Sequence, residues 1–98
     1  MSYFVEILLP ITKDAERDQI ETVREELTSQ FGGVTLHINA PAEGLWKDEG
    51  EIERDRIVVA EVMTEDLDRV WWVSYRKDLE RRFEQDEIVI RATMIERL

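Results

Sequence analysis

Four side chains that can carry a charge interrupt stretches of the chain that are otherwise apolar. They are Glu6, His37, Glu61 and Arg91, and each has a hydrophobic residue on either side. Alternation of this kind is typical of a strand with one buried face, so we expect these four side chains on the opposite face. If the strands that carry them are neighbours in one sheet, the four side chains form a polar row across it.

This polar row has two interpretations. Glu6 and Glu61 could be neighbouring carboxylates that share a proton or hold a cationic or hydroxylated ligand, with His37 and Arg91 beside them. In an enzyme the two glutamates would serve as acid and base, and Arg91 would hold an anion. Alternatively, the four residues form ordinary cross-strand charge pairs on a half-buried sheet, which is the commoner arrangement. A single histidine with no nucleophile beside it is weak evidence for catalysis.

A second group of candidate residues lies in the centre of the chain. Gly44 and Gly50 flank Trp46, and Arg54 precedes the apolar run that starts at Ile57. As a ligand site, Trp46 would form one wall of a pocket and Arg54 would bind a carboxylate or a phosphate. As structure, the segment is a hairpin-like loop that the tryptophan pins by folding back onto the protein.

The composition limits the class of protein. With 98 residues, of which 43% are hydrophobic, the chain predicts a single domain over residues 1–98. The net charge of −10 makes nucleic acid and anionic membranes unexpected partners. No apolar run approaches the ~20 residues that cross a bilayer, so a cytoplasmic location is expected. Because the chain has no cysteine and one histidine, no metal site and no cofactor are expected.

Hydrophobic periodicity predicts four strands and two helices. The first strand covers residues 3–9 and ends at Pro10. The first helix begins near Thr12, carries an apolar stripe and ends at Gly32-Gly33, because a helix end often needs a left-handed residue. The other predicted elements are strands over residues 34–39, 56–63 and 87–95, and a second helix that begins at Thr64-Glu65-Asp66.

The second helix has more aromatic surface than one buried stripe requires. We expect its inner face to hold Leu67, Val70, Trp71, Tyr75, Leu79 and Phe83. Trp72 would point away from this face and be partly exposed. A large exposed aromatic side chain often anchors an interface, although it could also lie over a neighbouring loop.

The order strand, helix, strand, strand, helix, strand predicts an α+β, ferredoxin-like fold. Right-handed crossovers place the four strands in one antiparallel sheet, with the last strand at one edge, the second at the other, and both helices on one face. The side chains expected toward the helices are Val5, Ile7, Leu9, Val34, Leu36, Ile38, Val58, Ala60, Val62, Ile88, Ile90 and Ala92. Those expected on the open face are Phe4, Glu6, Leu8, Thr35, His37, Asn39, Ile57, Val59, Glu61, Met63, Val89, Arg91, Thr93 and Ile95. Outside the polar row this open face is too apolar to stay in contact with water.

Several short motifs resemble the signature of a family of small, uncharacterised bacterial proteins. The motifs are Phe31-Gly32-Gly33-Val34-Thr35, Gly44-Leu45-Trp46-Lys47-Asp48, Gly50-Glu51-Ile52 and Arg54-Asp55, followed by Tyr75, Arg82-Phe83-Glu84-Gln85 and Val89. The family has a Gly-x-Trp-basic-acidic turn before its third strand, and the resemblance covers roughly residues 31–90. The first strand departs from the pattern, because Pro10-Ile11-Thr12 replaces a glycine-rich turn. The resemblance implies a ferredoxin-like fold and no particular activity.

The sequence therefore favours a small, non-catalytic binding or interaction module that self-associates, with a homodimer as the expected assembly. A small-molecule ligand or another protein is a possible further partner. The alternative is a small enzyme with Glu6 and Glu61 on the open face as its acid and base.

Overall fold

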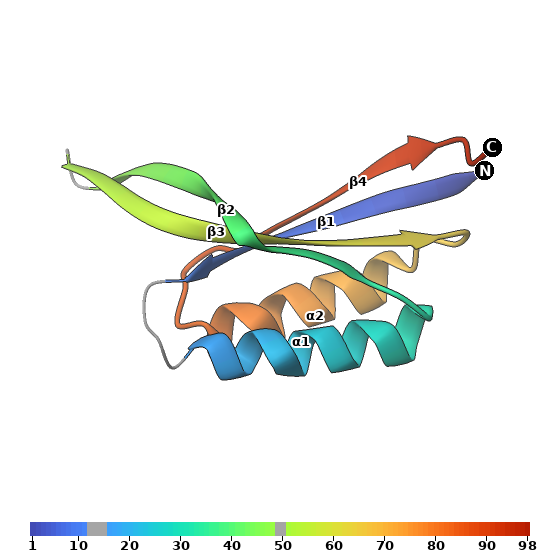
Figure 1. Ribbon diagram of the computed structural model, residues 1–98, viewed down its shortest axis with the longest axis horizontal. Coiled ribbons are helices and arrows are strands. Elements are labelled where there is room, and N and C mark those ends of the chain that lie inside the picture. The colour runs from blue at the N-terminus through green and yellow to red at the C-terminus, as the bar shows by residue number, and fades with distance from the viewer. Residues whose placement is uncertain (12–15, 49–50) are drawn as a thin grey trace.

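The chain forms the six predicted elements in the predicted order, as seen in a computed structural model that describes residues 1–11, 16–48 and 51–98 (Figure 1). Within these ranges, the side chains of residues 39–44 and 46–55 are not described. The elements are β1 (Ser2–Ile11), α1 (Glu16–Phe31), β2 (Thr35–Asp48), β3 (Glu51–Thr64), α2 (Arg69–Arg82) and β4 (Val89–Ile95). The strands form one antiparallel sheet in the order β2-β3-β1-β4, and both helices lie under the same face. The ferredoxin-like α+β fold is confirmed.

The hydrophobic core lies between the sheet and the two helices. In β1, the alternate residues Val5, Ile7 and Leu9 are buried, as the period of two in a strand requires. The other core residues are Ile20, Val23 and Leu27 of α1, Val58, Ala60 and Val62 of β3, Trp72, Tyr75, Leu79 and Phe83 in and after α2, and Ile88. The helix-facing side of β1 and β3 is therefore as predicted. In β2, Val34 and Leu36 pack against this core, whereas Ile38 is exposed.

Helix α1 has the predicted stripe and the predicted end. Ile20, Val23 and Leu27 recur at intervals of three and four residues and are buried. The helix ends at Phe31, and Gly32 follows with a φ of 83°, in the left-handed region that glycine adopts without strain. The predicted start at Thr12 lies outside the described residues.

The predicted start of α2 is wrong. Thr64 is still part of β3, and its hydroxyl donates a hydrogen bond to the carbonyl oxygen of Asp66. The helix begins at Arg69, and its N-cap is Asp68, whose carboxylate accepts a hydrogen bond from the Trp71 N–H at 3.1 Å. Asp68 has the extended backbone of an N-cap, so its side chain can reach an N–H group that has no partner inside the helix.

The buried face of α2 also differs from the prediction. Trp72 is only 5% exposed, so the expected partial exposure of this residue is wrong, and Val70, expected inside, is 81% exposed. The buried stripe runs through Trp72, Tyr75 and Leu79 and then Phe83, at the three- and four-residue spacing of a helical face. Trp72 stacks on Phe31, with ring centroids 5.1 Å apart. Trp72 packs inside its own domain and so offers little side-chain surface to a partner.

The connection from α2 to β4 is held by a side chain of the helix. The Glu80 carboxylate accepts a hydrogen bond from the Ile88 N–H at 2.9 Å and also pairs with Arg76. The hydrogen bond from Ile88 lowers the pKa of Glu80. This contact places Ile88 in the core directly before β4.

The central segment, expected as a hairpin-like loop, belongs to a long hairpin of β2 and β3. Backbone pairing runs from Ala42 opposite Ile57 to Asp48 opposite Glu51, with a register shift between His37 and Ala42. Figure 1 shows this hairpin extending beyond the ends of the helices. Strand β1 also continues through Pro10, where it was expected to stop. The pairing of β1 with β4 ends at Leu8, so at Pro10 only β3 is paired with β1. A proline, which has no N–H to donate, is tolerated at such an edge position.

Candidate functional site: the open face of the sheet

The four charged or ionisable side chains singled out in the sequence form the predicted polar row. Glu6 of β1 is the Cα partner of Glu61 in β3 and of Arg91 in β4. The Arg91 Nε donates a hydrogen bond to the Glu6 Oε1 at 2.9 Å. At the other end, the His37 Nε2 of β2 lies 2.8 Å from the Glu61 Oε1. The row thus crosses all four strands in the order His37, Glu61, Glu6, Arg91.

The two carboxylates of the row are more sheltered than their cationic partners. The side chains of Glu6 and Glu61 are 21% and 23% exposed, whereas those of Arg91 and His37 are 59% and 50% exposed. Each carboxylate has a basic group of its own, Arg91 for Glu6 and His37 for Glu61. This pairing is the arrangement that the cross-strand interpretation predicts.

Apolar side chains flank the polar row on both sides. On one side Leu8 is the Cα partner of Val59 and Val89. On the other side Phe4 is the Cα partner of Met63 and Thr93. The strand alternation puts all of these side chains on the face away from the helices. The open face is therefore striped: apolar, charged, apolar.

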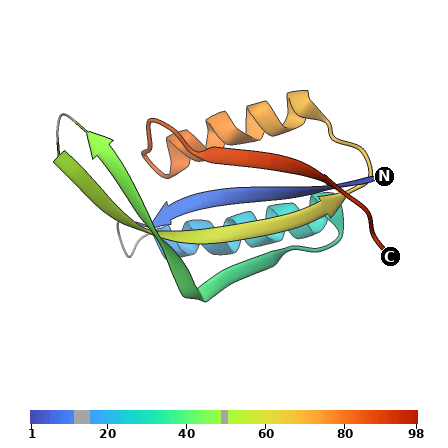
Figure 2. The same cartoon turned by 90° about the horizontal axis from the view of Figure 1, so that it is seen from above.

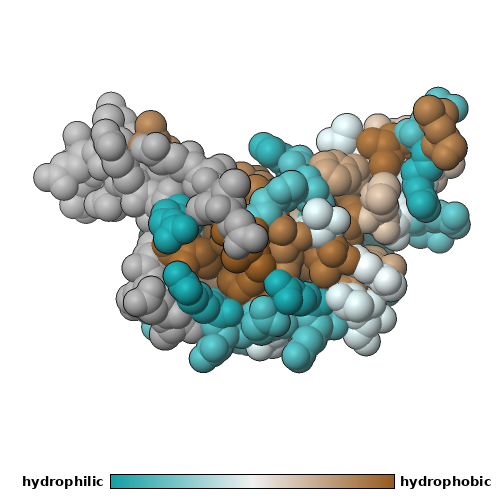
Figure 3. All heavy atoms as spheres, in the orientation of Figure 1, coloured by the Kyte–Doolittle hydropathy of each residue, from teal (hydrophilic) through white to brown (hydrophobic). Residues whose placement is uncertain are grey.

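The open face carries no helix in the part of the chain that the structure describes. Figure 2 looks onto the sheet from above, with α1 behind β1 and β3 and α2 beyond the edge that β4 forms. Figure 3 shows hydrophobic surface at the end of the sheet where β1 begins and β4 ends. Near this end Met63 and Met94 are 50% and 56% exposed. Ile57, expected on the open face, is nevertheless buried, as is its Cα partner Pro10.

The second predicted group, Trp46 and Arg54, lies in the projecting hairpin. Trp46 is the Cα partner of Glu53, and Arg54 is the Cα partner of Leu45. Both residues stand in paired strands of the hairpin, and the predicted ligand pocket at this point stays a prediction. Their side chains lie outside those described, and so does that of Asn39.

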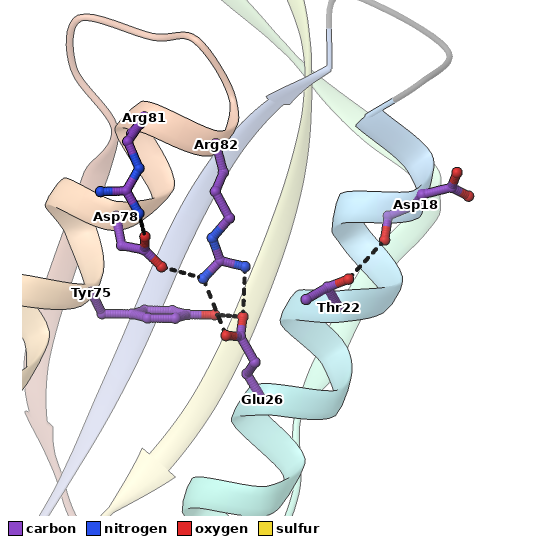
Figure 4. A network of polar contacts seen from close by, with 7 residues as sticks. All are labelled: Asp18, Thr22, Glu26, Tyr75, Asp78, Arg81 and Arg82. Atoms are coloured by element: carbon purple, nitrogen blue, oxygen red, sulfur yellow. Dashed lines mark hydrogen bonds and ion pairs between the residues drawn. The ribbon is translucent and has the colours of Figure 1, made fainter.

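A polar network between the helices was not predicted from the sequence (Figure 4). The Arg82 guanidinium donates to both carboxylate oxygens of Glu26 in α1, at 2.8 and 3.2 Å. It also donates to Asp78 at 2.6 Å, and the Tyr75 hydroxyl donates to Glu26 at 3.2 Å. Asp78 also pairs with Arg81. We call these contacts of Glu26, Tyr75, Asp78 and Arg82 the interhelical clasp.

The clasp shifts the pKa of two of its members. Burial raises the pKa of Tyr75, and the Glu26 carboxylate beside the hydroxyl raises it further. Burial opposes the charge on Arg82, but hydrogen bonds to Glu26 and Asp78 outweigh it and raise the pKa of the guanidinium. Both shifts favour the protonated form of the group that donates to the carboxylates. A sequence signal did exist, because Tyr75 and Arg82 are seven residues apart on one helical face.

An open groove runs along the outer side of the clasp. Its lining includes Glu25 and Ser29 from α1 and Trp71, Ser74 and Lys77 from α2. The lining mixes carboxylate, ammonium and hydroxyl groups, so no single ligand chemistry stands out.

Two further properties concern metals and membranes. Among the described residues, no group of three histidine, aspartate or glutamate side chains is arranged to hold a metal ion. No helix in the described ranges is long and apolar enough to cross a membrane.

Comparisons with known proteins reveal a shared fold. Neither a protein-family model nor a curated protein sequence matches the chain. Among solved structures, the chain is similar to the divalent cation tolerance protein CutA1 from Thermus thermophilus, with a TM-score of 0.66, 15% identity and coverage of 99% of this chain and 86% of that one. It is also similar to the periplasmic divalent cation tolerance protein CutA from Archaeoglobus fulgidus, with a TM-score of 0.60, 23% identity and coverage of 99% and 86%. CutA1 from Oryza sativa gives a TM-score of 0.62, 17% identity and coverage of 97% and 80%. At these identities the likeness establishes the fold, which is that of the CutA1 structures over nearly the whole chain.

Proposed function

We propose that this domain is a non-catalytic interaction module that self-associates through the open face of its sheet, with a second copy of the chain as the occupant of that face. One observation carries the proposal: the charges of the polar row pair with one another inside the sheet, between two apolar stripes. A charge that already has a partner costs less to remove from water than an isolated one.

The charge distribution favours this face over the rest of the surface for contact between two copies. The whole chain carries a net charge of −10, so two copies repel each other at a distance. The polar row carries a net charge of −1 when His37 is neutral, from two glutamates and one arginine. A nearly neutral, apolar face is where like-charged copies meet with the least electrostatic cost. A two-fold symmetric dimer would use the same face from both copies.

Two other roles have less support from the contacts of the row. An acid–base enzyme would use Glu6 and Glu61, but each carboxylate is engaged by Arg91 or His37. The similar CutA structures are named for divalent cation tolerance, and carboxylate oxygens are ligands for such ions. A cation at this row would have to displace the paired arginine and histidine. The interaction module needs no such rearrangement.

Two methionines provide a matched test of the proposal. Met63 lies on the open face and Met94 on the face of β4 turned toward the helices, and the two are about equally exposed. Met63→Glu adds a negative charge to the proposed contact, so we expect the variant to be monomeric where the parent protein is a dimer. Met94→Glu adds the same charge outside the contact, so it should leave the dimer intact.

Sedimentation equilibrium over a wide concentration range measures the outcome, with circular dichroism to verify that both variants are folded. A parent protein that stays monomeric throughout would refute the proposed function. Equal weakening by both substitutions would place the contact somewhere other than the open face.

A further inference from the structure

Strand β4 has fewer anchors than β1 or β3. It lies at one edge of the sheet and pairs with β1 along its whole length. All seven of its residues are at least partly exposed, whereas β1 and β3 both contribute buried residues to the core. Its apolar anchors are Ile88, which directly precedes the strand and is buried, and Ile90, which packs against the core while partly exposed. Its ion pair, Arg91 with Glu6, involves a largely exposed arginine and contributes little stability.

A side chain of α2 holds the first of these anchors in place. The Glu80 carboxylate accepts a hydrogen bond from the Ile88 N–H at 2.9 Å, and the Arg76 Nη1 donates to both of its oxygens, at 3.0 and 2.9 Å. The Glu80 side chain is 15% exposed, so these hydrogen bonds are largely sheltered from water. Pairing with β1 starts at Val89, so Glu80 fixes the chain at the point where it enters the sheet.

We propose that Glu80 is a latch for β4, and that release of this latch lets β4 open as a unit while the rest of the sheet and both helices stay folded. Native proteins open locally in cooperative segments, and an edge strand with few buried residues belongs to the less stable ones. Opening leaves the N–H and C=O groups on one edge of β1 without partners, which is the kind of edge that a further strand can join. The latch lies on the helix side of the sheet and is separate from the open face.

Hydrogen exchange of single amides, measured by NMR, distinguishes the opening of β4 from a loosening of the whole sheet. In an antiparallel sheet the N–H groups of successive residues in a strand point to opposite neighbours. Along β1, one alternate set of amides therefore donates to β4 and the other set donates to β3. If β4 opens alone, the amides between β1 and β4 exchange faster than those between β1 and β3. We expect this alternation in the parent protein.

Three substitutions test the role of Glu80. Glu80→Ala removes the acceptor, so exchange of the amides between β1 and β4 should rise roughly tenfold, the effect expected for loss of a hydrogen bond to a charged group. Glu80→Gln keeps an oxygen that can accept from Ile88 but loses the charge that binds Arg76, so its exchange should lie between the two. Glu87→Ala is the matched control, because it removes an exposed glutamate next to Ile88 and should leave the exchange unchanged.

Circular dichroism verifies that each variant is folded, and if Glu80→Ala is not, the parent protein and Glu80→Gln provide the test. Two sets of β1 amides that exchange equally in the parent, or that accelerate equally in Glu80→Ala or Glu80→Gln, would show that the sheet opens as a whole and would overturn the proposal. An equal acceleration by Glu87→Ala would also overturn it, because the effect would then come from lost negative charge rather than from the contact with Ile88.

Discussion

Arg81 and Arg82 are neighbours in α2 with very different surroundings. The Arg82 side chain is 17% exposed and binds Glu26 and Asp78, whereas the Arg81 side chain is 77% exposed and pairs with Asp78. A sheltered charge pair loses much more when one member is removed, because the remaining charge is left without its partner. An exposed pair is worth little, since water replaces the lost contact.

Methionine substitutions at these two positions test the clasp. Arg82→Met keeps much of the side-chain volume and leaves Glu26 without its bidentate partner, so we expect a loss of about 1–3 kcal/mol in the free energy of unfolding. Arg81→Met, the matched control, should change it by less than about 0.5 kcal/mol. Urea denaturation followed by circular dichroism measures both values. Similar losses for the two variants would show that the clasp contributes no more than a surface ion pair.

The polar row and the clasp explain which site residues a sequence can reveal. Glu6 and Arg91 lie 85 residues apart, yet their contact was predicted because strand alternation and the strand order of the fold place them opposite each other. The contact of Glu26 with Arg82 depends on how two helices are rotated against one another. Sequence periodicity gives the buried stripe of each helix but not the side chains that meet beside it.

At the scale of the elements, the two helices end in different ways. Helix α1 is followed by Gly32, with a φ of 83°, whereas α2 is followed by its C-cap Phe83 and then by Glu84, with a φ of 52°. After α2, the Gln85 N–H donates to the Glu80 carbonyl and the Glu84 N–H donates to the Arg81 carbonyl, which is the Schellman pattern of a helix end. This pattern needs a left-handed residue, and a non-glycine residue adopts that conformation at a cost of roughly 1 kcal/mol.

Exchanging glycine and non-glycine residues at these ends should change stability in opposite directions. Glu84→Gly should raise the free energy of unfolding by about 0.5–1 kcal/mol, and Gly32→Ala should lower it by about 1 kcal/mol. Gly33→Ala is the control, because Gly33 is not left-handed and an added Cβ there meets nothing within 4 Å. Thermal and urea denaturation provide the comparison. A Glu84→Gly variant less stable than the parent would mean that the contacts of the glutamate outweigh its backbone strain.

The elements that were wrongly predicted share a physical cause. For α2, Thr64-Glu65-Asp66 and Asp68 are both acceptable helix starts by residue type, and the tertiary structure selects Asp68. The rotation of the helix against the sheet then buries Trp72 and leaves Val70 exposed. In the central segment, glycines and alternating charges indicated a turn. The paired strands there are held by backbone hydrogen bonds, which side-chain patterns do not report.

At the scale of the whole molecule, the excess of negative charge opposes any contact between copies. Acidic residues number 23 and basic residues 13, and the charge of the open face is a small part of the difference. The repulsion acts between surfaces that stay in water, so dissolved ions screen it. Contact between apolar stripes is not weakened by salt, and the pairs of the polar row exist in the monomer as well as in the dimer. The repulsion between the copies and the contact between their apolar stripes therefore respond differently to ionic strength.

Salt dependence thus distinguishes an open-face dimer from one that joins surfaces of opposite charge. For the open-face dimer, raising sodium chloride from about 0.05 M to about 0.5 M at constant pH should tighten association several-fold, since the Debye length falls well below 10 Å. A dimer in which the acids of α1 meet the bases of α2 would respond in the opposite way, because its attraction is itself screened. Sedimentation of the parent protein at both concentrations gives the sign, and Met63→Glu should stay monomeric at the lower one. If association weakens with salt instead, the interface lies on the helices, and the open face does not bind the open face of a second copy.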